Sequence, residues 1–275
     1  MLRVVLFLLL IVSLIPAKEI RVVSLYSAYT EILVGIGCKD KIVGTTYRDA
    51  KKMGITSVGN HMTPSIEAVI SCNPTFVLGL DSGNKYDKMR VYLDKLGISY
   101  LFTSPKTVES VKSLIVNLGK TLGADTEASQ RVNEINKYLD SAKTVISKLS
   151  KSKKTVFVEV RQSPAILSIG DSSIVADVLK KANCIPLTYG KSSVNIVDIE
   201  RILADNPDFY IQQIGVMNRS PLPLNSVNIL SNIEAIKSEH FGTIQEKLIS
   251  RPGLNIGKAV YVLAKMVYGD EDKNE

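Results

Sequence analysis

Short runs of aliphatic and β-branched residues alternate along the chain with amphipathic segments. The runs in the first half are apolar at nearly every position, which is typical of parallel strands covered by helices on both faces. The predicted strands are 21–25 (RVVSL), 41–46 (KIVGTT), 75–80 (TFVLGL) and 98–103 (ISYLFT). The predicted helices are 28–36, 65–71, 85–96 and 107–122, the last ending at Gly123. This alternation predicts an open α/β sheet.

Residues 125–149 carry a different pattern, a single long amphipathic segment. The segment contains no Gly or Pro, and its apolar positions recur at spacings of three and four, as they do on one face of a helix. A helix of this length spans roughly 36 Å, at about 1.5 Å per residue. It is therefore long enough to cross one small lobe and join it to another.

Beyond this segment the strand–helix pattern resumes. The predicted strands are 155–160 (TVFVEV), 165–169 (AILSI) and 208–212 (DFYIQ), and the predicted helices are 174–182 and 259–267. We therefore predict an α/β protein of two open lobes with mainly parallel sheets. The N-terminal lobe would span 18–124, the bridging helix 125–150 and the C-terminal lobe 151–275.

An internal repeat supports the division into two lobes. Residues 67–78 read EAVISCNPTFVL and residues 200–211 read ERILADNPDFYI. Each sequence predicts a short helix that ends at Asn-Pro, because Pro cannot continue a helix, followed at once by a buried strand. Chance similarity of two helix–proline–strand units is the alternative. The repeat puts Glu67 and Glu200 at equivalent places, either as ordinary N-terminal helix charges or as a matched acidic pair, one on each lobe.

The N-terminus predicts export. Residues 1–17 read MLRVVLFLLLIVSLIPA, with one Arg, an apolar run of about a dozen residues and then Pro-Ala, as in a secretory signal peptide. The run is short for a membrane span, which needs about 20 residues, although an uncleaved anchor is the alternative. We expect a periplasmic or other extracytoplasmic protein.

Composition and charge exclude several functions. Hydrophobic residues make up 45% of the chain and charged residues 22%, as in an ordinary globular protein, and the net charge is +7. Residues 148–154 (KLSKSKK) are rich in Lys but contain no aromatic residue, so a nucleic-acid site is not expected. The chain has only two His, which argues against a histidine-rich metal site. We therefore expect no metal site and no cofactor.

The sequence also lacks the common catalytic motifs. G-x-S-x-G, G-x-x-x-x-G-K-[ST] and H-E-x-x-H are all absent, so we do not expect an enzyme. Cys38, Cys72 and Cys184 show no C-x-x-C spacing. A disulfide between Cys38 and Cys72 and buried free thiols both remain open.

Four segments together carry a family resemblance. They are RVVSLYSAYTEILVGIGCKDKIVG near the start, VGNHMTPSIEAVISCNPTFVL, then VFVEV followed by SIGDSSIVADVLKKAN, and a closing segment with Arg251-Pro252-Gly253. In this order and spacing, the chain resembles ABC-transporter substrate-binding proteins of the ferric-siderophore, cobalamin and haem group. That resemblance implies two lobes joined by a rigid helix. It also implies that Glu67 and Glu200 dock on arginine pockets of a dimeric membrane permease.

The sequence departs from this family pattern at two informative places. Tyr26-Ser27-Ala28 stands where the family usually has Ser-Pro-Ser, and the chain has no Trp, although the aromatic platform of cobalamin binders includes one. These departures make cobalamin a less favoured ligand.

The candidate ligand-binding residues follow the predicted strands, because ligands bind beyond the carboxyl ends of the strands in open α/β sheets. They are Tyr26, Tyr47, Arg48, Leu80, Asp81, Arg161, Gln162, Gln213 and Arg219. The resemblance adds His61, at a place that lines the cleft in the family, and it could ligate haem iron or a metal. Arg recognises anionic oxygens through paired hydrogen bonds, and Tyr supplies stacking area and a hydroxyl.

These observations predict a monomeric binding protein that captures a small-molecule iron complex, of the ferric siderophore kind, between two lobes and delivers it to an ABC importer. A cobalamin, haem or metal-ion binding protein of the same import machinery is the alternative.

Overall fold

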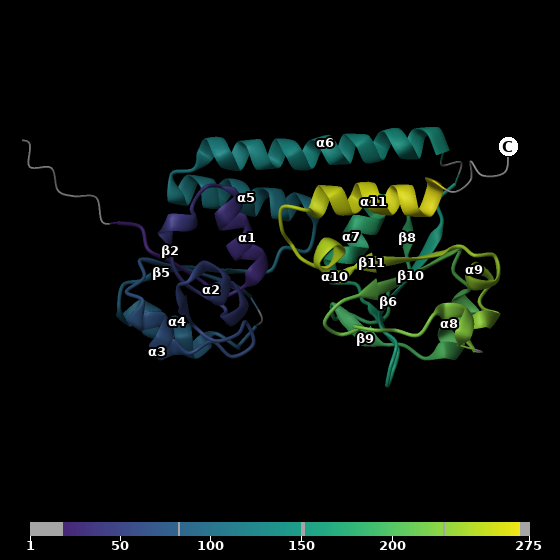
Figure 1. The fold of residues 1–275 in the computed structure, drawn as a ribbon, viewed down its shortest axis with the longest axis horizontal. Helices are drawn as coiled ribbons and strands as arrows, with labels where there is room; N and C mark the ends of the chain where they lie inside the picture. The colour runs from purple at the N-terminus through teal and green to yellow at the C-terminus, as the bar shows by residue number, and fades with distance from the viewer. Residues whose placement is uncertain (1–18, 82, 150–151, 228, 270–275) are drawn as a thin grey trace, which may run out of the picture.

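The computed structural model consists of two α/β lobes, with the long helix α6 (Asp125–Leu149) lying along both of them (Figure 1). The structure describes residues 19–81, 83–149, 152–227 and 229–269. The fold class predicted from the sequence is confirmed, and α6 coincides with the predicted long helix. The predicted signal peptide, 1–17, lies outside the described residues.

The first lobe contains a five-stranded parallel sheet in the order β3-β2-β1-β4-β5. Its strands are β1 (Val22–Ser24), β2 (Ile42–Thr45), β3 (Thr56–Ser57), β4 (Phe76–Leu80) and β5 (Ser99–Thr103). Its helices are α1 (Ser27–Gly35), α2 (Tyr47–Met53), α3 (Ile66–Ser71), α4 (Asp87–Lys95) and α5 (Val108–Leu122). The sequence did not predict β3 and α2, because β3 is exposed and α2 buries only Ala50.

The second lobe contains a mixed six-stranded sheet in the order β11-β10-β6-β7-β9, with β8 beside β6. Its strands are β6 (Thr155–Arg161), β7 (Leu167–Ile169), β8 (Ile185–Pro186), β9 (Val194–Ile196), β10 (Phe209–Ile214) and β11 (Phe241–Gln245). β7 runs antiparallel to both β6 and β9, and the other pairings are parallel. The helices are α7 (Ile174–Lys181), α8 (Ile199–Asp205), α9 (Glu234–Lys237), α10 (Glu246–Ile249) and α11 (Ile256–Tyr268).

One continuous apolar core runs beneath α6 and through both lobes. The buried face of α6 contributes Ala128, Ile135 and Ala142 to a cluster that also includes α1, α5, α7 and α11. Gly257 lets α11 approach α6 closely, since a Cβ at this position would lie 2.5 Å from the Ile135 carbonyl oxygen. Gly119 plays the same part between α5 and α6, where a Cβ would lie 2.5 Å from the Ala128 Cβ. The two lobes are thus packed on a common helical layer.

The sequence repeat is present as a structural repeat. α3 and α8 are each followed by an Asn in left-handed backbone conformation, Asn73 at φ 46° and Asn206 at φ 39°, and then by Pro and a strand. Asn is one of the few residues that adopt this conformation readily, and Pro prevents the helix from continuing. The following strand lies beside the lobe's first strand in both cases, β4 beside β1 and β10 beside β6.

Cys38, Cys72 and Cys184 are buried free thiols. None of the helices within the described ranges is both long and apolar enough to cross a membrane.

Candidate functional site

Tyr26 and His61 form an aromatic pair at the carboxyl ends of the first lobe's strands. Tyr26 follows β1 and is the N-cap residue of α1, and its backbone carbonyl accepts hydrogen bonds from the amides of Tyr29 and Thr30. Its ring lies 5.7 Å from the His61 ring and 5.1 Å from the Tyr29 ring, measured between centroids. Burial raises the pKa of the Tyr26 phenol, so this phenol is protonated at neutral pH.

His61 is held by its neighbours in the exposed loop between β3 and α3. The Asn60 side-chain oxygen accepts hydrogen bonds from the Met62 and Thr63 amides, and the Tyr86 hydroxyl donates to the His61 carbonyl at 2.9 Å. Partial burial lowers the pKa of His61, and the nearby charges of Lys85 and Arg251 lower it further. The imidazole is therefore neutral at neutral pH, which leaves a nitrogen lone pair available.

Arg251 is a second-lobe residue whose charge acts on both Tyr26 and His61. It follows α10, lies 3.7 Å from the Glu246 carboxylate, and its charge lowers the pKa values of both Tyr26 and His61. Glu246 also accepts a hydrogen bond from the Val216 amide at 2.7 Å. Sequence reasoning did not select Arg251 or Glu246 as ligand-binding residues, because neither follows a strand that the sequence predicted. The only signal for Arg251 was its place in the Arg-Pro-Gly motif.

The other first-lobe candidates lie in different surroundings. The sequence places Tyr47 and Arg48 in a loop, but the structure puts them in the first turn of α2, where both are exposed. The helix forms here because the Tyr47 amide donates to the Gly59 carbonyl and Thr46 adopts the extended conformation of an N-cap residue. Leu80 ends β4 and packs partly on the core. Asp81 is exposed and pairs with Arg90 at 3.2 Å.

The second-lobe candidates Gln213, Gln162 and Arg161 are engaged in hydrogen bonds within their own lobe. Gln213 is only 2% exposed, and its side-chain oxygen accepts a hydrogen bond from the Ser250 hydroxyl. Gln162 exchanges two hydrogen bonds with the Leu222 backbone, at 3.2 and 2.8 Å. Arg161 ends β6, is half-buried, and donates to the Ala165 carbonyl at 3.3 Å. Arg219 is exposed in the segment after β10.

Glu67 and Glu200 are exposed in the first turns of α3 and α8, one on each lobe. Both helices lie on the side of the molecule away from α6 (Figure 1). A hydrogen bond from its own backbone amide, and then one from the Ser65 hydroxyl, lower the pKa of Glu67. Glu67 is therefore a carboxylate at neutral pH.

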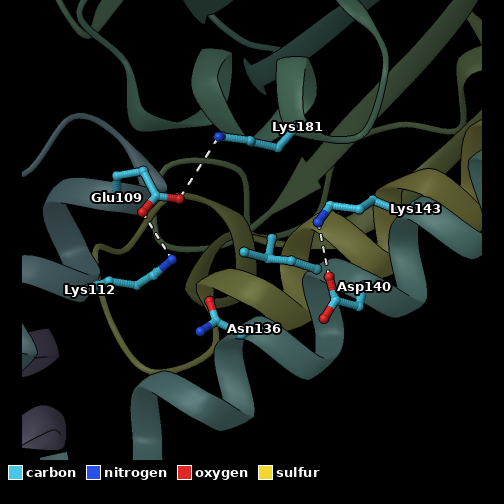
Figure 2. A pocket seen from close by; sticks show the side chains of 7 residues that line it. Glu109, Lys112, Asn136, Asp140, Lys143 and Lys181 are labelled. Atoms are coloured by element: carbon cyan, nitrogen blue, oxygen red, sulfur yellow. Dashed lines mark hydrogen bonds and ion pairs between the residues drawn. The ribbon is translucent and has the colours of Figure 1, made fainter. Parts of the chain in front are cut away.

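A separate pocket of about 320 Å³ lies where α5, α6 and α7 meet (Figure 2). Its charged side chains pair with one another, Lys112 and Lys181 with Glu109, and Lys143 with Asp140. The described residues hold no cluster of three His, Cys, Asp or Glu side chains suited to a metal ion.

Comparison with known proteins identifies the family. Residues 22–259 match the family model for periplasmic binding proteins. The chain belongs to the periplasmic binding protein family. Members of this family are substrate-binding proteins of ABC transporters and are not enzymes, so both expectations from the sequence are confirmed.

Individual relatives are distant but match over most of the chain. The chain is 26% identical to the uncharacterized ABC transporter substrate-binding lipoprotein YvrC of Bacillus subtilis, over 92% of this chain and 81% of that protein. It is 23% identical to the high-affinity heme uptake system protein IsdE of Staphylococcus aureus, over 87% of this chain and 82% of that protein. The vitamin B12 binding protein BtuF of Vibrio cholerae has a similar fold, with a TM-score of 0.76 and 17% identity, over 90% of this chain and 96% of that one.

Proposed function

We propose that this periplasmic binding protein captures an iron complex between its two lobes and delivers it to an ABC importer. The observation that carries the proposal is the placement of Tyr26 and His61 of the first lobe within reach of the charge on Arg251 of the second. The similarity to IsdE, a heme uptake protein, supports an iron-containing ligand.

The chemistry of these three groups suits a ferric complex with anionic oxygens, such as a ferric siderophore. The Arg251 guanidinium can donate paired hydrogen bonds to carboxylate, catecholate or hydroxamate oxygens. Tyr26 offers a ring face and a hydroxyl to the same ligand. The neutral His61 imidazole adds a nitrogen that can accept a hydrogen bond or ligate the metal.

Haem is the second candidate, and the pairing of Tyr26 with His61 is the observation that favours it. Tyr and His are both known axial ligands of haem iron. Their rings lie 5.7 Å apart at the same edge of the sheet, so both could reach one flat ligand. Arg251 would then neutralise a propionate.

We further propose that delivery uses Glu67 and Glu200. One carboxylate on each lobe matches a permease with two equivalent subunits, each presenting arginines, and such contacts supply orientation and a fast association rate. In this proposal the binding protein is a monomer, and residues 1–17 direct its export.

Intrinsic tyrosine fluorescence tests the ligand proposal, because the chain has 11 Tyr and no Trp. The protein without residues 1–17 would be titrated with a ferric hydroxamate, a ferric catecholate, haemin and cyanocobalamin. Saturable quenching at micromolar or lower concentration by one of the iron complexes supports the proposal. Quenching by cyanocobalamin alone, or no response from a folded protein, contradicts it.

Matched variants locate the site. Arg251→Ala should weaken the binding of an anionic iron complex by more than tenfold, whereas Arg201→Ala, on the exposed face of α8, should leave it unchanged. Tyr26→Phe should weaken binding more than Tyr47→Phe, because Tyr26 is packed beside His61 and Tyr47 is 62% exposed on α2.

A further inference from the structure

The second lobe contains a buried carboxylate that the proposed ligand contacts do not use. Glu159 lies in the middle of β6 with no solvent exposure. Its oxygens accept hydrogen bonds from three neutral side chains, Tyr210 at 2.8 Å, Gln212 at 3.1 Å and Asn218 at 3.0 Å. Burying a carboxylate among neutral partners is unfavourable, and it raises the pKa of Glu159. Because burial of the Glu159 carboxylate is unfavourable, its presence here suggests a structural or functional role.

The three donors come from two different parts of the lobe. Tyr210 and Gln212 are on the neighbouring strand β10, whereas Asn218 belongs to the segment 215–222 that follows β10. Asn218 is itself 6% exposed. Its side-chain nitrogen also donates to the Gln213 carbonyl at 3.0 Å, and its side-chain oxygen accepts from the Gln162 backbone amide at 3.2 Å. The Asn218 side chain therefore links this segment to Glu159 of β6, to Gln213 of β10 and to Gln162.

The far end of the segment belongs to the same network. The Leu222 carbonyl accepts hydrogen bonds from the side chains of Gln162 and Gln212, each at 3.2 Å, and the Leu222 amide donates back to Gln162 at 2.8 Å. Gln212 is also a donor to Glu159. Asn218 in the middle of the segment 215–222 and Leu222 at its far end are thus held by one connected set of side chains, Glu159, Gln212 and Gln162.

The beginning of the segment, Val216 and Met217, is linked to the candidate ligand site. The Val216 amide donates to Glu246, and Glu246 pairs with Arg251, whose charge reaches Tyr26 and His61. Val216 and Met217 are large apolar side chains that are 51% and 45% exposed. Exposed apolar side chains beside a cleft are typical of ligand contacts.

We propose that the segment 215–222 is the second-lobe wall of the ligand site, that Val216 and Met217 contact the ligand, and that Glu159 is the residue that positions this wall. A ligand that fits this wall has an apolar face next to its own anionic groups. The inference rests on the proposed function, because it assumes that the ligand lies between Arg251 and Tyr26. Holding the wall in place before binding removes an ordering cost that a flexible segment would add to each binding event.

The test compares Asn218→Ala with Tyr210→Phe, since both remove a hydrogen bond to Glu159 but only Asn218 lies in the segment. Asn218→Ala also removes the hydrogen bonds of this side chain to the backbone of Gln213 and Gln162. Amide hydrogen exchange is measured first, without ligand. Asn218→Ala should speed exchange in residues 215–222 by at least tenfold and leave β1 and β4 unchanged, whereas Tyr210→Phe should not affect the segment. Gln162→Ala, at a half-exposed position, gives a second variant if Asn218→Ala fails to fold.

Haemin, an iron complex with an apolar face and two carboxylates, is the binding probe. Asn218→Ala should weaken haemin binding by at least tenfold, and Met217→Ser should weaken it without changing hydrogen exchange. Unchanged exchange in both Asn218→Ala and Gln162→Ala overturns the positioning role. Faster exchange with unchanged haemin affinity, or an unaffected Met217→Ser, overturns the role of the segment as a ligand wall.

The two proposals fail in different ways. If the unaltered protein binds neither haemin nor another ferric complex, the proposed function and the ligand wall fail together, while the exchange experiment still decides whether Glu159 positions the segment.

Discussion

Arg251 and Tyr26 belong to different lobes, yet the charge of Arg251 lowers the pKa of the Tyr26 phenol against the larger, opposite effect of burial. The same charge acts on His61. Arg251 of the second lobe therefore acts electrostatically on two aromatic residues of the first, at the place where we propose that the ligand contacts both lobes.

The pKa of His61 should rise when Arg251 is replaced by Ala. A neighbouring cation disfavours protonation of the imidazole, so removing the cation moves the pKa upward toward the ordinary value for His. Lys85→Ala should act in the same direction. Proton NMR can follow the titration, because the chain has only two His and His240 provides an internal reference. An unchanged His61 pKa in both variants would show that neither cation acts on His61.

The lowered pKa of His61 affects the pH dependence expected for ligand binding. Because the pKa of His61 is lowered, its neutral form persists to a more acidic pH than that of a free His. If the ligand uses the imidazole lone pair, its affinity for the unaltered protein should fall as the pH drops through the lowered His61 pKa, at a more acidic pH than for a free His. In Arg251→Ala, that fall should begin at a higher pH.

Replacing Glu67 and Glu200 together by Gln should abolish transport and leave ligand affinity intact. Both carboxylates are exposed in the first turns of α3 and α8, one on each lobe. Ligand transport into vesicles that carry the partner importer measures the first effect, and fluorescence titration measures the second. Glu134→Gln, on the exposed surface of α6, is the matched control. Loss of ligand affinity in the double variant would show that the glutamates belong to the ligand site instead.

Asn73→Ala and Asn206→Ala should each destabilise the protein by about 1–2 kcal/mol, because Ala tolerates positive φ poorly. The matched variants Asn73→Gly and Asn206→Gly should lose much less, since Gly adopts this conformation freely. Urea unfolding monitored by circular dichroism gives the free energies. Equal losses for Ala and Gly at one position would mean that the Asn side chain matters there more than its backbone conformation.

Much of the fold could be predicted because buried parallel strands and a long amphipathic helix leave strong hydrophobic patterns. The helix 125–149 was predicted at the bounds found, and most of the predicted strands agree with the structure within two residues. The missed elements lack that signal. β3 is two exposed polar residues, and β9 has no fully buried residue. The antiparallel direction of β7 depends on a short hairpin that periodicity does not report.

The site could be predicted only in part, because its partners are distant in sequence. Tyr26 follows a clear strand, and His61 entered through a family resemblance. Arg251 and Glu246 come from the closing segment and reach the site only through the packing of the second lobe. Glu159 is one polar residue inside an apolar strand, and its three donors lie more than 50 positions away.

Gly257→Ala should destabilise the protein, although Ala is the better helix former by about 1 kcal/mol. The added methyl group would overlap the Ile135 carbonyl of α6, and such overpacking typically costs about 1–3 kcal/mol. Thermal unfolding measures the effect, and Lys258→Ala, at the next and exposed position of α11, is the control. A Gly257→Ala protein as stable as the original would show that α11 can shift on α6 without loss.

The shared layer of α5, α6 and α11 also determines what a ligand can do to this molecule. One apolar core runs through both lobes, so a large movement of one lobe relative to the other would disrupt its packing. We therefore expect ligand binding to cause little movement between the lobes. The free energy of the ligand contacts can then contribute to affinity, and we expect the bound and empty forms to differ mainly at the ligand site. An importer that has to choose between them would then have to sense the cargo and its rim directly, rather than the overall shape of its carrier.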